Sequence, residues 1–274
     1  MSSFLSHRRK AFRGGADPVS NPLHHWDLTT LATGTGCLDQ GSGAWGELTQ
    51  PTNTPDENPS GAPDGTSTCL NFVTRSPSAS DYLSSGDKVW DGGTDGFSCS
   101  VWVKLDAIST TANYILSWRG TTYTVDPYIF DMRIDNDGAD YTAQGLIVEA
   151  LGGDDSYRQA ADTSPSSSPN VGTATWYHMV FTFDTTDNEA KLYIGTTGTA
   201  PTLQGTNTAS VGTISALETT TAAPFNIGSF VGTGSQGTSH NGDMYCMSIY
   251  DYALSTDDIS FLWNSGDGRK YSEL

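Results

Sequence analysis

The sequence lacks the features that would insert a chain into a membrane or stabilise it by disulfide bonds. No apolar run approaches the length of a membrane span, and the N-terminus has no apolar core of the kind that a secretory signal needs. Cysteine is scarce, and Cys37, Cys69, Cys99 and Cys246 show no Cys-x-x-Cys spacing. We therefore expect no membrane insertion, no export by that route and no disulfide framework. Cys99 and Cys246 lie in apolar strand patterns, which predicts buried, reduced thiols and fits cytosolic synthesis.

Basic residues and glutamate are scarce as well. The chain has 13 Lys and Arg against 31 Asp and Glu, which gives a net charge of −18, and only 6 of the acidic residues are Glu. Aspartate is a turn residue, so this charge is expected in loops rather than along helix faces. An acidic surface of this size argues against nucleic-acid binding by the body of the protein and favours solubility.

What the chain does contain favours strands and turns. It has 30 Gly in 274 residues, with many Thr and Ser beside aromatic and β-branched residues. The length suits one large all-β domain or two small ones with a sizeable buried core.

Residues 1–20 differ from the rest of the chain. Four of the 13 basic residues fall within the first 13 positions, beside three apolar side chains. Such a segment is too short and polar to bury its own surface, so we expect a docking arm that lies on a neighbouring subunit or another protein. The alternative is an arm folded back on its own domain. The expected docking residues are Phe4, Leu5, Arg8, Arg9, Lys10, Phe12 and Arg13.

Strand patterns begin clearly at Phe97, where Phe97, Cys99, Val101 and Val103 fall on one face of a strand. Further strands are expected over 69–73, 114–118, 128–134, 145–150, 176–183, 190–194, 224–227 and 243–250, separated by turns.

One short helix is expected near the C-terminus. Ser255 can cap it, with Asp258 three residues on in a weaker form of the capping box. Ile259 and either Leu262 or Trp263 would face the sheet.

Six short segments appear in a fixed order along the chain. They are LHHWDL (23–28), FSCSVWVK (97–104), WYHMVFTFD (176–184), KLYI (191–194), FNIG (225–228) and 242–255, which ends in IYDYALS. This order resembles the concanavalin A-like, laminin-G-like jelly-roll domains, a fold also found in bacteriophage virion proteins. The resemblance implies a two-sheet antiparallel β-sandwich over residues 21–270, carrying the arm at 1–20.

Because the resemblance includes glucanases, an enzyme must be considered, but the residues argue against it. Glucanases of this superfamily use closely spaced carboxylates in a Glu-x-Asp-x-Glu-like run, whereas the six glutamates here are all isolated. The five histidines show no metal-ligand spacing. His178 lies within a strand and is expected to be structural. We predict no catalytic residues.

Calcium is implied by the resemblance, because laminin-G-like domains often bind it with loop carboxylates and backbone carbonyls. Asp39 and Asp243 match by position and are the expected ligands. At the late strand Tyr245 stands where relatives often have Asp, with Asp243 shifted by two positions. The segment 135–140 (DNDGAD) is better explained as a hairpin turn than as a calcium loop.

Sugar binding needs aromatic platforms beside polar groups. Five residues at or near turns are the candidates, and each has the alternative of lying in the core or an interface. They are Trp118, Arg119, Tyr123, Tyr141 and Tyr157.

Three functions from different classes remain open. The first is a non-enzymatic structural protein of a bacteriophage virion, a capsid decoration or tail-associated protein made in the host cytoplasm. It would be a homo-oligomer that contacts other virion proteins through the arm and displays loops to host glycans. The second is a carbohydrate-binding adhesin module with calcium-held loops. The third, a glycoside hydrolase, lacks its carboxylate pair.

Overall fold

The computed structural model describes most of the chain outside its first 18 residues. The described residues are 19–31, 37–43, 45–49, 54–73, 81–107, 112–119, 128–136, 141–148, 156–162, 171–217, 222–232, 235–236 and 239–274. The expected docking residues between Phe4 and Arg13 therefore lie outside the described part. Within these ranges, no helix has both the length and the apolar character needed to span a membrane.

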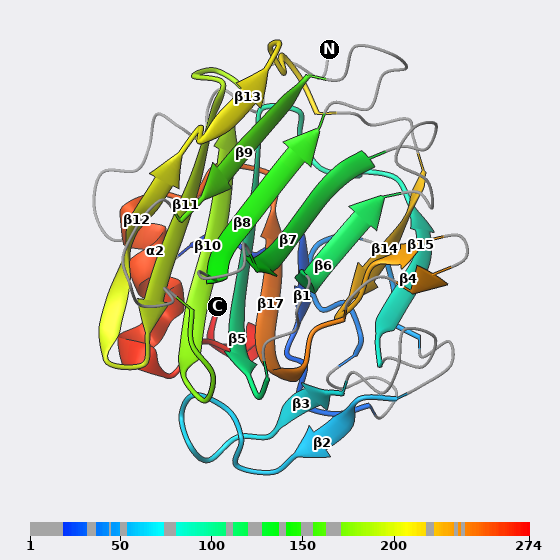
Figure 1. Ribbon diagram of the computed structural model, residues 1–274, viewed down its shortest axis with the longest axis vertical. Helices are drawn as coiled ribbons and strands as arrows, with labels where there is room; N and C mark the ends of the chain where they lie inside the picture. The colour runs from blue at the N-terminus through cyan, green and yellow to red at the C-terminus, as the bar shows by residue number, and fades with distance from the viewer. Residues whose placement is uncertain are drawn as a thin grey trace.

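Two antiparallel sheets face each other across one core (Figure 1). The eight-stranded sheet has the order β12 (Thr199–Thr206), β11 (Glu189–Thr196), β10 (Trp176–Asp184), β5 (Gly96–Leu105), β17 (Gly242–Tyr250), β3 (Cys69–Phe72), β2 (Asp56–Asn58), with β1 (His24–Trp26) also paired to β17. The seven-stranded sheet has the order β13 (Ala209–Val211), β9 (Tyr157–Ala161), β8 (Tyr141–Val148), β7 (Tyr128–Asn136), β6 (Asn113–Arg119), β14 (Ala223–Ile227), β4 (Leu83–Lys88). A separate hairpin joins β15 (Val231–Gly232) to β16 (Ser235–Gln236). This is the predicted β-sandwich.

Alternation along the strands builds the core. The predicted inward face of β5, with Phe97 and Val101 among its members, is fully buried. From the opposite sheet, β7 contributes Phe130, Met132 and Ile134, which are also fully buried. Successive side chains of a strand point to opposite faces, so the side chains between these positions point to the outside of the sandwich.

The outer face of the eight-stranded sheet is covered by the end of the chain. Helix α2 (Thr256–Trp263) buries Ile259 and Leu262 against Val180 and Tyr193. Val19 joins this cluster and is only 3 % exposed. Val19, next to the end of the predicted arm, therefore packs on the sandwich.

The capping prediction for α2 is confirmed. The Ser255 hydroxyl accepts from the Asp258 backbone N–H at 3.2 Å, and the Asp258 carboxylate accepts from the Ser255 N–H at 2.9 Å. The helix ends where Asn264 adopts a left-handed conformation with φ 52°.

Replacing the cap residue tests how much the capping of this short helix contributes to the stability of the protein. Ser255→Ala should lower the free energy of unfolding by about 1 kcal/mol, because it removes an acceptor from the first helical turn. Ser260→Ala, in the same helix, is the control and should leave stability within about 0.5 kcal/mol. Urea denaturation measures both, and equal effects of the two variants would contradict the capping role.

Candidate functional site

The outer face of the seven-stranded sheet carries a row of polar side chains. On β7, Asp131, Arg133 and Asp135 alternate with the buried apolar residues and therefore point outward. Neighbouring strands extend the row, because Arg133 is in register with Gln144 of β8 and the next strand, β9, supplies Gln159. We call the following set the polar strip: Arg119, Asp131, Arg133, Asp135, Gln144 and Gln159.

Two guanidinium groups and two carboxylates balance each other in the polar strip. Asp131 Oδ2 lies 3.7 Å from Arg119 Nη1 and 3.7 Å from Arg133 Nη1. Arg133 Nη2 lies 3.4 Å from Asp135 Oδ2. The hydroxyl of Tyr114 accepts from Arg119 Nη2 at 3.0 Å and from Arg133 Nη1 at 3.1 Å. The set has no net formal charge in a chain whose net charge is −18.

Carboxamides continue the network toward β9. Gln159 Nε2 donates to Gln144 Oε1 at 2.8 Å, and Arg133 Nη2 donates to the same oxygen at 3.4 Å. Gln144 Nε2 donates to Asp135 Oδ2 at 3.5 Å. These contacts hold hydrogen-bonding groups in fixed positions on three adjacent strands.

The exposure of the polar strip to solvent differs between its β6 end and β7. At the β6 end, Arg119 is only 3 % exposed, and its guanidinium lies 3.6 Å from the ring centroid of Phe230. Toward β8, the side chains of Arg133 and Asp135 are 22 % and 25 % exposed. The part of the strip that a soluble ligand can reach is therefore made by Arg133 and Asp135 of β7 and by Gln159 of β9, at the front of Figure 1, while Gln144 of β8 lies buried between them.

The residues predicted from the sequence to contact sugar lie in different environments. Arg119 belongs to the polar strip, whereas the prediction for Trp118 is wrong. Trp118 is fully buried, and its indole N–H donates to the backbone oxygen of Lys88 at 3.2 Å. Tyr157 is partly exposed at the start of β9. Tyr123 and the side chain of Tyr141 lie outside the described residues.

The structure does not bring the two expected calcium ligands together. Asp39 lies beside β1, where its carboxylate meets His24 Nδ1 at 2.6 Å and accepts from the His25 backbone N–H at 3.1 Å. Asp243 lies near the opposite end of β17, six residues from the position that pairs with His24, or roughly 20 Å away by the rise of a strand. Asp39 and Asp243 therefore cannot contribute to the same ion site.

Asp243 already has basic and amide partners. Its carboxylate is 2.5 Å from Lys104 Nζ and accepts from Asn58 Nδ2 at 3.1 Å and from Asn71 Nδ2 at 2.7 Å. A buried carboxylate paired in this way has its charge compensated by protein groups. Its role is to connect β17 to β2, β3 and β5.

His24 forms a buried link between Asp39 and Asp91. Its Nδ1 lies 2.6 Å from Asp39 and its Nε2 lies 2.9 Å from Asp91, while the ring stacks on Trp45 with centroids 3.9 Å apart. Burial by itself lowers the pKa of His24, but hydrogen bonds and the charges of the two carboxylates outweigh burial, so the pKa is raised above its ordinary value. The imidazole, whose protonated form both carboxylates favour, thus holds the loop after β1 against the 81–107 segment.

A serine, a histidine and an aspartate lie in line nearby. Ser248 Oγ is 2.7 Å from His25 Nδ1, and His25 Nε2 is 2.8 Å from Asp27 Oδ1. The order matches a nucleophile, base and orienting carboxylate. Ser248 is only 3 % exposed and His25 is fully buried, so no substrate reaches the hydroxyl. Ser248 therefore has no access to a substrate that it could attack.

Two further groups of residues bear on catalysis. His178 is fully buried, meets Ser100 Oγ at 2.8 Å and stacks on Trp102, and burial lowers its pKa to about 3. It is structural, as predicted. In the polar strip, the Arg133 guanidinium interacts with both Asp131 and Asp135. A glycosidase needs the space between its two carboxyl groups for the scissile bond, or for a water, and here that space holds a cation.

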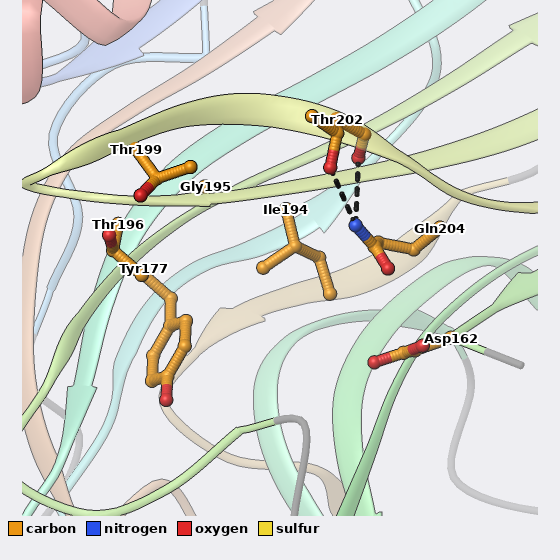
Figure 2. Close-up of a pocket in the computed structure, with 8 residues that line it drawn as sticks. All are labelled: Asp162, Tyr177, Ile194, Gly195, Thr196, Thr199, Thr202 and Gln204. Atoms are coloured by element: carbon orange, nitrogen blue, oxygen red, sulfur yellow. Dashed lines mark hydrogen bonds between the residues drawn. The ribbon is translucent and has the colours of Figure 1, made fainter. Parts of the chain in front are cut away.

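A small pocket opens at the edge of the sandwich, where β9 approaches β10, β11 and β12. Figure 2 shows Asp162, Tyr177, Ile194 and Gln204 around it, with threonine side chains of the β11–β12 hairpin beside them. Its volume is about 250 Å³. This is below the roughly 300–1,000 Å³ of most small-molecule sites.

The family assignment agrees with this architecture. Residues 77–260 match the family described as the concanavalin A-like lectin/glucanases superfamily. The chain belongs to this family. Its members share the lectin-like β-sandwich, and the superfamily includes both binding domains and glucanases. The search of curated proteins found no match to this sequence.

Solved structures show the same fold at low identity. Domain 4 of AbnA, a GH43 extracellular arabinanase from Geobacillus stearothermophilus in complex with arabinotriose, matches with a TM-score of 0.53 and 16 % identity over 90 % of this chain and 98 % of that one. A sialidase from Trypanosoma rangeli matches with a TM-score of 0.52 and 16 % identity over 94 % of this chain and 35 % of that one. The enzymatically active domain of tailspike protein 2 from bacteriophage CBA120 matches with a TM-score of 0.52 and 13 % identity over 81 % of this chain and 31 % of that one.

Stability should depend on pH through His24. A raised pKa means that the contribution of the imidazolium is complete below the unfolded value of about 6.5 and is lost as the pH rises through the folded value. His24→Gln should therefore cost more unfolding free energy at pH 5.5 than at pH 9, as measured by urea denaturation at both values.

His178→Gln should show the opposite pH dependence, with a larger loss of unfolding free energy at high pH than at low pH. The pKa of His178 is lowered to about 3, so its neutral ring contributes most above pH 6.5 and less as the medium becomes acid.

For His24→Gln, a loss of unfolding free energy that is the same at both pH values would contradict the ionic link between His24 and its two carboxylates.

Proposed function

We propose that this protein is a non-enzymatic carbohydrate-binding β-sandwich that holds neutral glycans on the polar strip. The observation that carries the proposal is the ordered array of guanidinium, carboxylate and carboxamide groups over β7, β8 and β9, partly open to solvent. Sugar hydroxyls both donate and accept hydrogen bonds, and this array supplies fixed partners of both kinds.

The charge balance of the polar strip favours a neutral sugar over an acidic one. Both arginines already face Asp131, and Arg133 also faces Asp135. An anionic ligand would have to displace one of these carboxylates and would meet a chain of net charge −18. A neutral sugar can bind through hydrogen bonds while the ion pairs stay in place.

Two further observations support a binding role without catalysis. Arg133 occupies the space between Asp131 and Asp135, which leaves no gap for a scissile bond. The fold is also shared with domain 4 of AbnA, whose structure contains arabinotriose.

Isothermal titration calorimetry with neutral trisaccharides tests the proposal. Arabinotriose, xylotriose and cellotriose form the neutral panel, and sialyllactose is the anionic comparator. At least one neutral sugar should bind saturably and more tightly than sialyllactose, and no sugar should be hydrolysed on prolonged incubation. Arg133→Gln should weaken that binding about tenfold or more, since a hydrogen bond to a charged group contributes about 1.5–3 kcal/mol. Gln159→Ala should weaken it by a smaller factor, since a hydrogen bond between neutral groups contributes about 0.5–1.5 kcal/mol.

Lys191→Gln is the matched control, because Lys191 is a partly exposed cation on β11 of the other sheet. It should bind as the unmodified protein does. Binding that survives both strip variants, or that falls equally in the control, would place the sugar elsewhere. Release of reducing sugar would overturn the non-enzymatic assignment.

A second candidate is a structural protein of a bacteriophage particle, anchored by the N-terminal segment and displaying the sandwich. It is supported by the charge segregation in the sequence, where four of the 13 basic residues lie in the first 13 positions of an acidic chain. A fold shared with a bacteriophage tailspike domain is compatible with it. In this role the protein is made in the host cytoplasm, assembles as a homo-oligomer with other virion proteins, and uses the polar strip on host glycans.

Co-sedimentation with particles depleted of the protein tests this role. The full-length chain should bind saturably, whereas a variant with Arg8, Arg9, Lys10 and Arg13 changed to Ala should lose most of the binding, because the contact is electrostatic at this tip. Equal binding of the two proteins, or failure of both, would contradict anchoring by the basic segment.

A further inference from the structure

A histidine, an aspartate and a cysteine meet beneath the C-terminal segment, where β1 and β3 follow one another along the same edge of β17. Met244 of β17 pairs with Leu70 of β3, and Met247 pairs with Trp26 of β1. Cys246 lies between these pairs, within the register shift of the β17–β5 ladder, and its backbone N–H donates to the Asp27 backbone oxygen at 3.0 Å.

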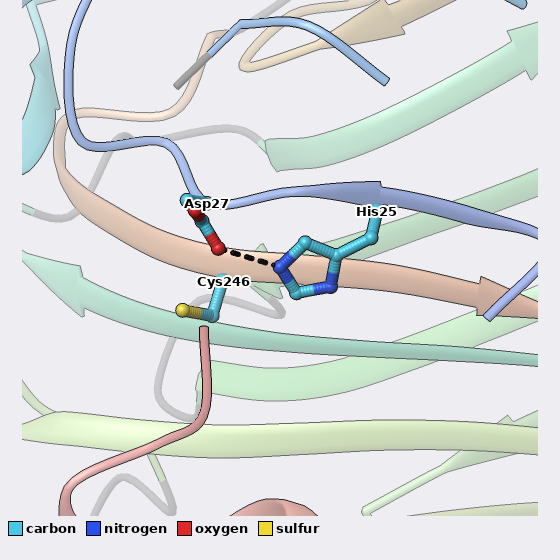
Figure 3. A group of neighbouring side chains, drawn as sticks. All are labelled: His25, Asp27 and Cys246. Carbon is cyan, nitrogen blue, oxygen red and sulfur yellow. Dashed lines mark hydrogen bonds and ion pairs between the residues drawn. The ribbon is translucent and has the colours of Figure 1, made fainter. Parts of the chain in front are cut away.

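Cys246 is held in an unusual backbone conformation. Its φ is +46°, in the left-handed region that costs a non-glycine residue roughly 1–2 kcal/mol. The residue sits at a β-bulge, a feature that redirects a side chain out of the regular alternation of a strand. Here the bulge brings a thiol beside His25 and Asp27 rather than leaving it in the sheet (Figure 3).

The three side chains offer one nitrogen, one oxygen and one sulfur at close range. A ring nitrogen of His25, an Asp27 carboxylate oxygen and Cys246 Sγ all lie within 4.8 Å of one another, and the nitrogen that meets Asp27 is Nε2, at 2.8 Å. An ion placed among atoms this close needs side-chain shifts of about 0.5 Å to reach the bond lengths of zinc, about 2.0–2.3 Å. His25 is fully buried and Cys246 is 4 % exposed, while Asp27 keeps 17 % of its side chain exposed as a path of entry.

Neighbouring groups orient two of the three donors. The Ser248 hydroxyl lies 2.7 Å from His25 Nδ1, and the Asp27 carboxylate accepts from Gln40 Nε2 at 3.0 Å and from the Tyr271 backbone N–H at 2.9 Å. Histidine ligands commonly donate their second ring N–H to such a partner. A serine hydroxyl can accept that bond as readily as it donates one, so His25 can present an unprotonated Nε2 without losing Ser248.

We infer that His25, Asp27 and Cys246 form a binding site for a zinc-like divalent cation. The nitrogen and sulfur donors exclude the oxygen-preferring calcium and magnesium ions and suit zinc, cobalt or cadmium. An aspartate and a thiolate together neutralise a divalent ion. The ion would join the end of β1 to the bulge of β17, under the C-terminal segment whose Tyr271 ring lies 5.7 Å from the His25 ring. This site is separate from the polar strip.

Cobalt(II) is the probe, because a cysteine thiolate bound to it gives a charge-transfer absorption band in the near ultraviolet. The full-length protein, freed of metal by a chelator and desalted, should bind one equivalent of Co²⁺ with this band. Zn²⁺ should abolish the band by displacement and should raise the thermal midpoint, since an ion that binds only the folded state stabilises it. Ca²⁺ should do neither.

Cys246→Ser should lose the charge-transfer band, and Cys99→Ala, which removes another buried thiol, should keep it. Absence of the band from the unmodified protein at saturating Co²⁺ would overturn the inference, and this readout does not depend on whether the variants fold. Retention of the band in Cys246→Ser would overturn it equally, because the sulfur donor would then be a different cysteine.

Discussion

The alternation of side chains along β7 is the constraint on which both the core and the polar strip depend. Phe130, Met132 and Ile134 must face the opposite sheet for the sandwich to close, and this orients Asp131 and Arg133 outward by geometry alone. A slip of one residue would turn the charged residues into the core between the sheets and the apolar ones away from it, so stability and binding select the same register. The site is therefore as rigid as the sheet beneath it.

Much of the fold could be predicted because local signals agree with the packing. The strands around Phe97 and Trp176 alternate clearly and lie at the centre of their sheet, and Ser255 caps α2 through neighbours close in sequence. Strand β12 could not be predicted in this way. Its sequence TAPTLQGT has little apolar alternation, because it is a largely exposed edge strand whose conformation comes from pairing with β11.

The candidate site was harder to predict than the fold. Aromatic residues near turns drew attention to Trp118, but its place in β6 directs the ring into the core. The polar strip depends instead on register across several strands, such as Arg133 opposite Gln144, which is a long-range property. The partners of Asp39 and Asp243 were also hidden, because His24 and Lys104 reach them only through tertiary contacts. The alternating Asp131-Met132-Arg133-Ile134-Asp135 was the one local signal that could have indicated the site.

The most direct test of the account is to map, residue by residue, where a neutral oligosaccharide binds. Backbone amide shifts measured by nuclear magnetic resonance during a titration with arabinotriose, or with the best-binding neutral sugar, would do this. The account predicts changes concentrated on β7, β8 and β9, around Arg133, Gln144 and Gln159. Changes confined to the edge pocket beside Tyr177, or to the eight-stranded sheet, would contradict it.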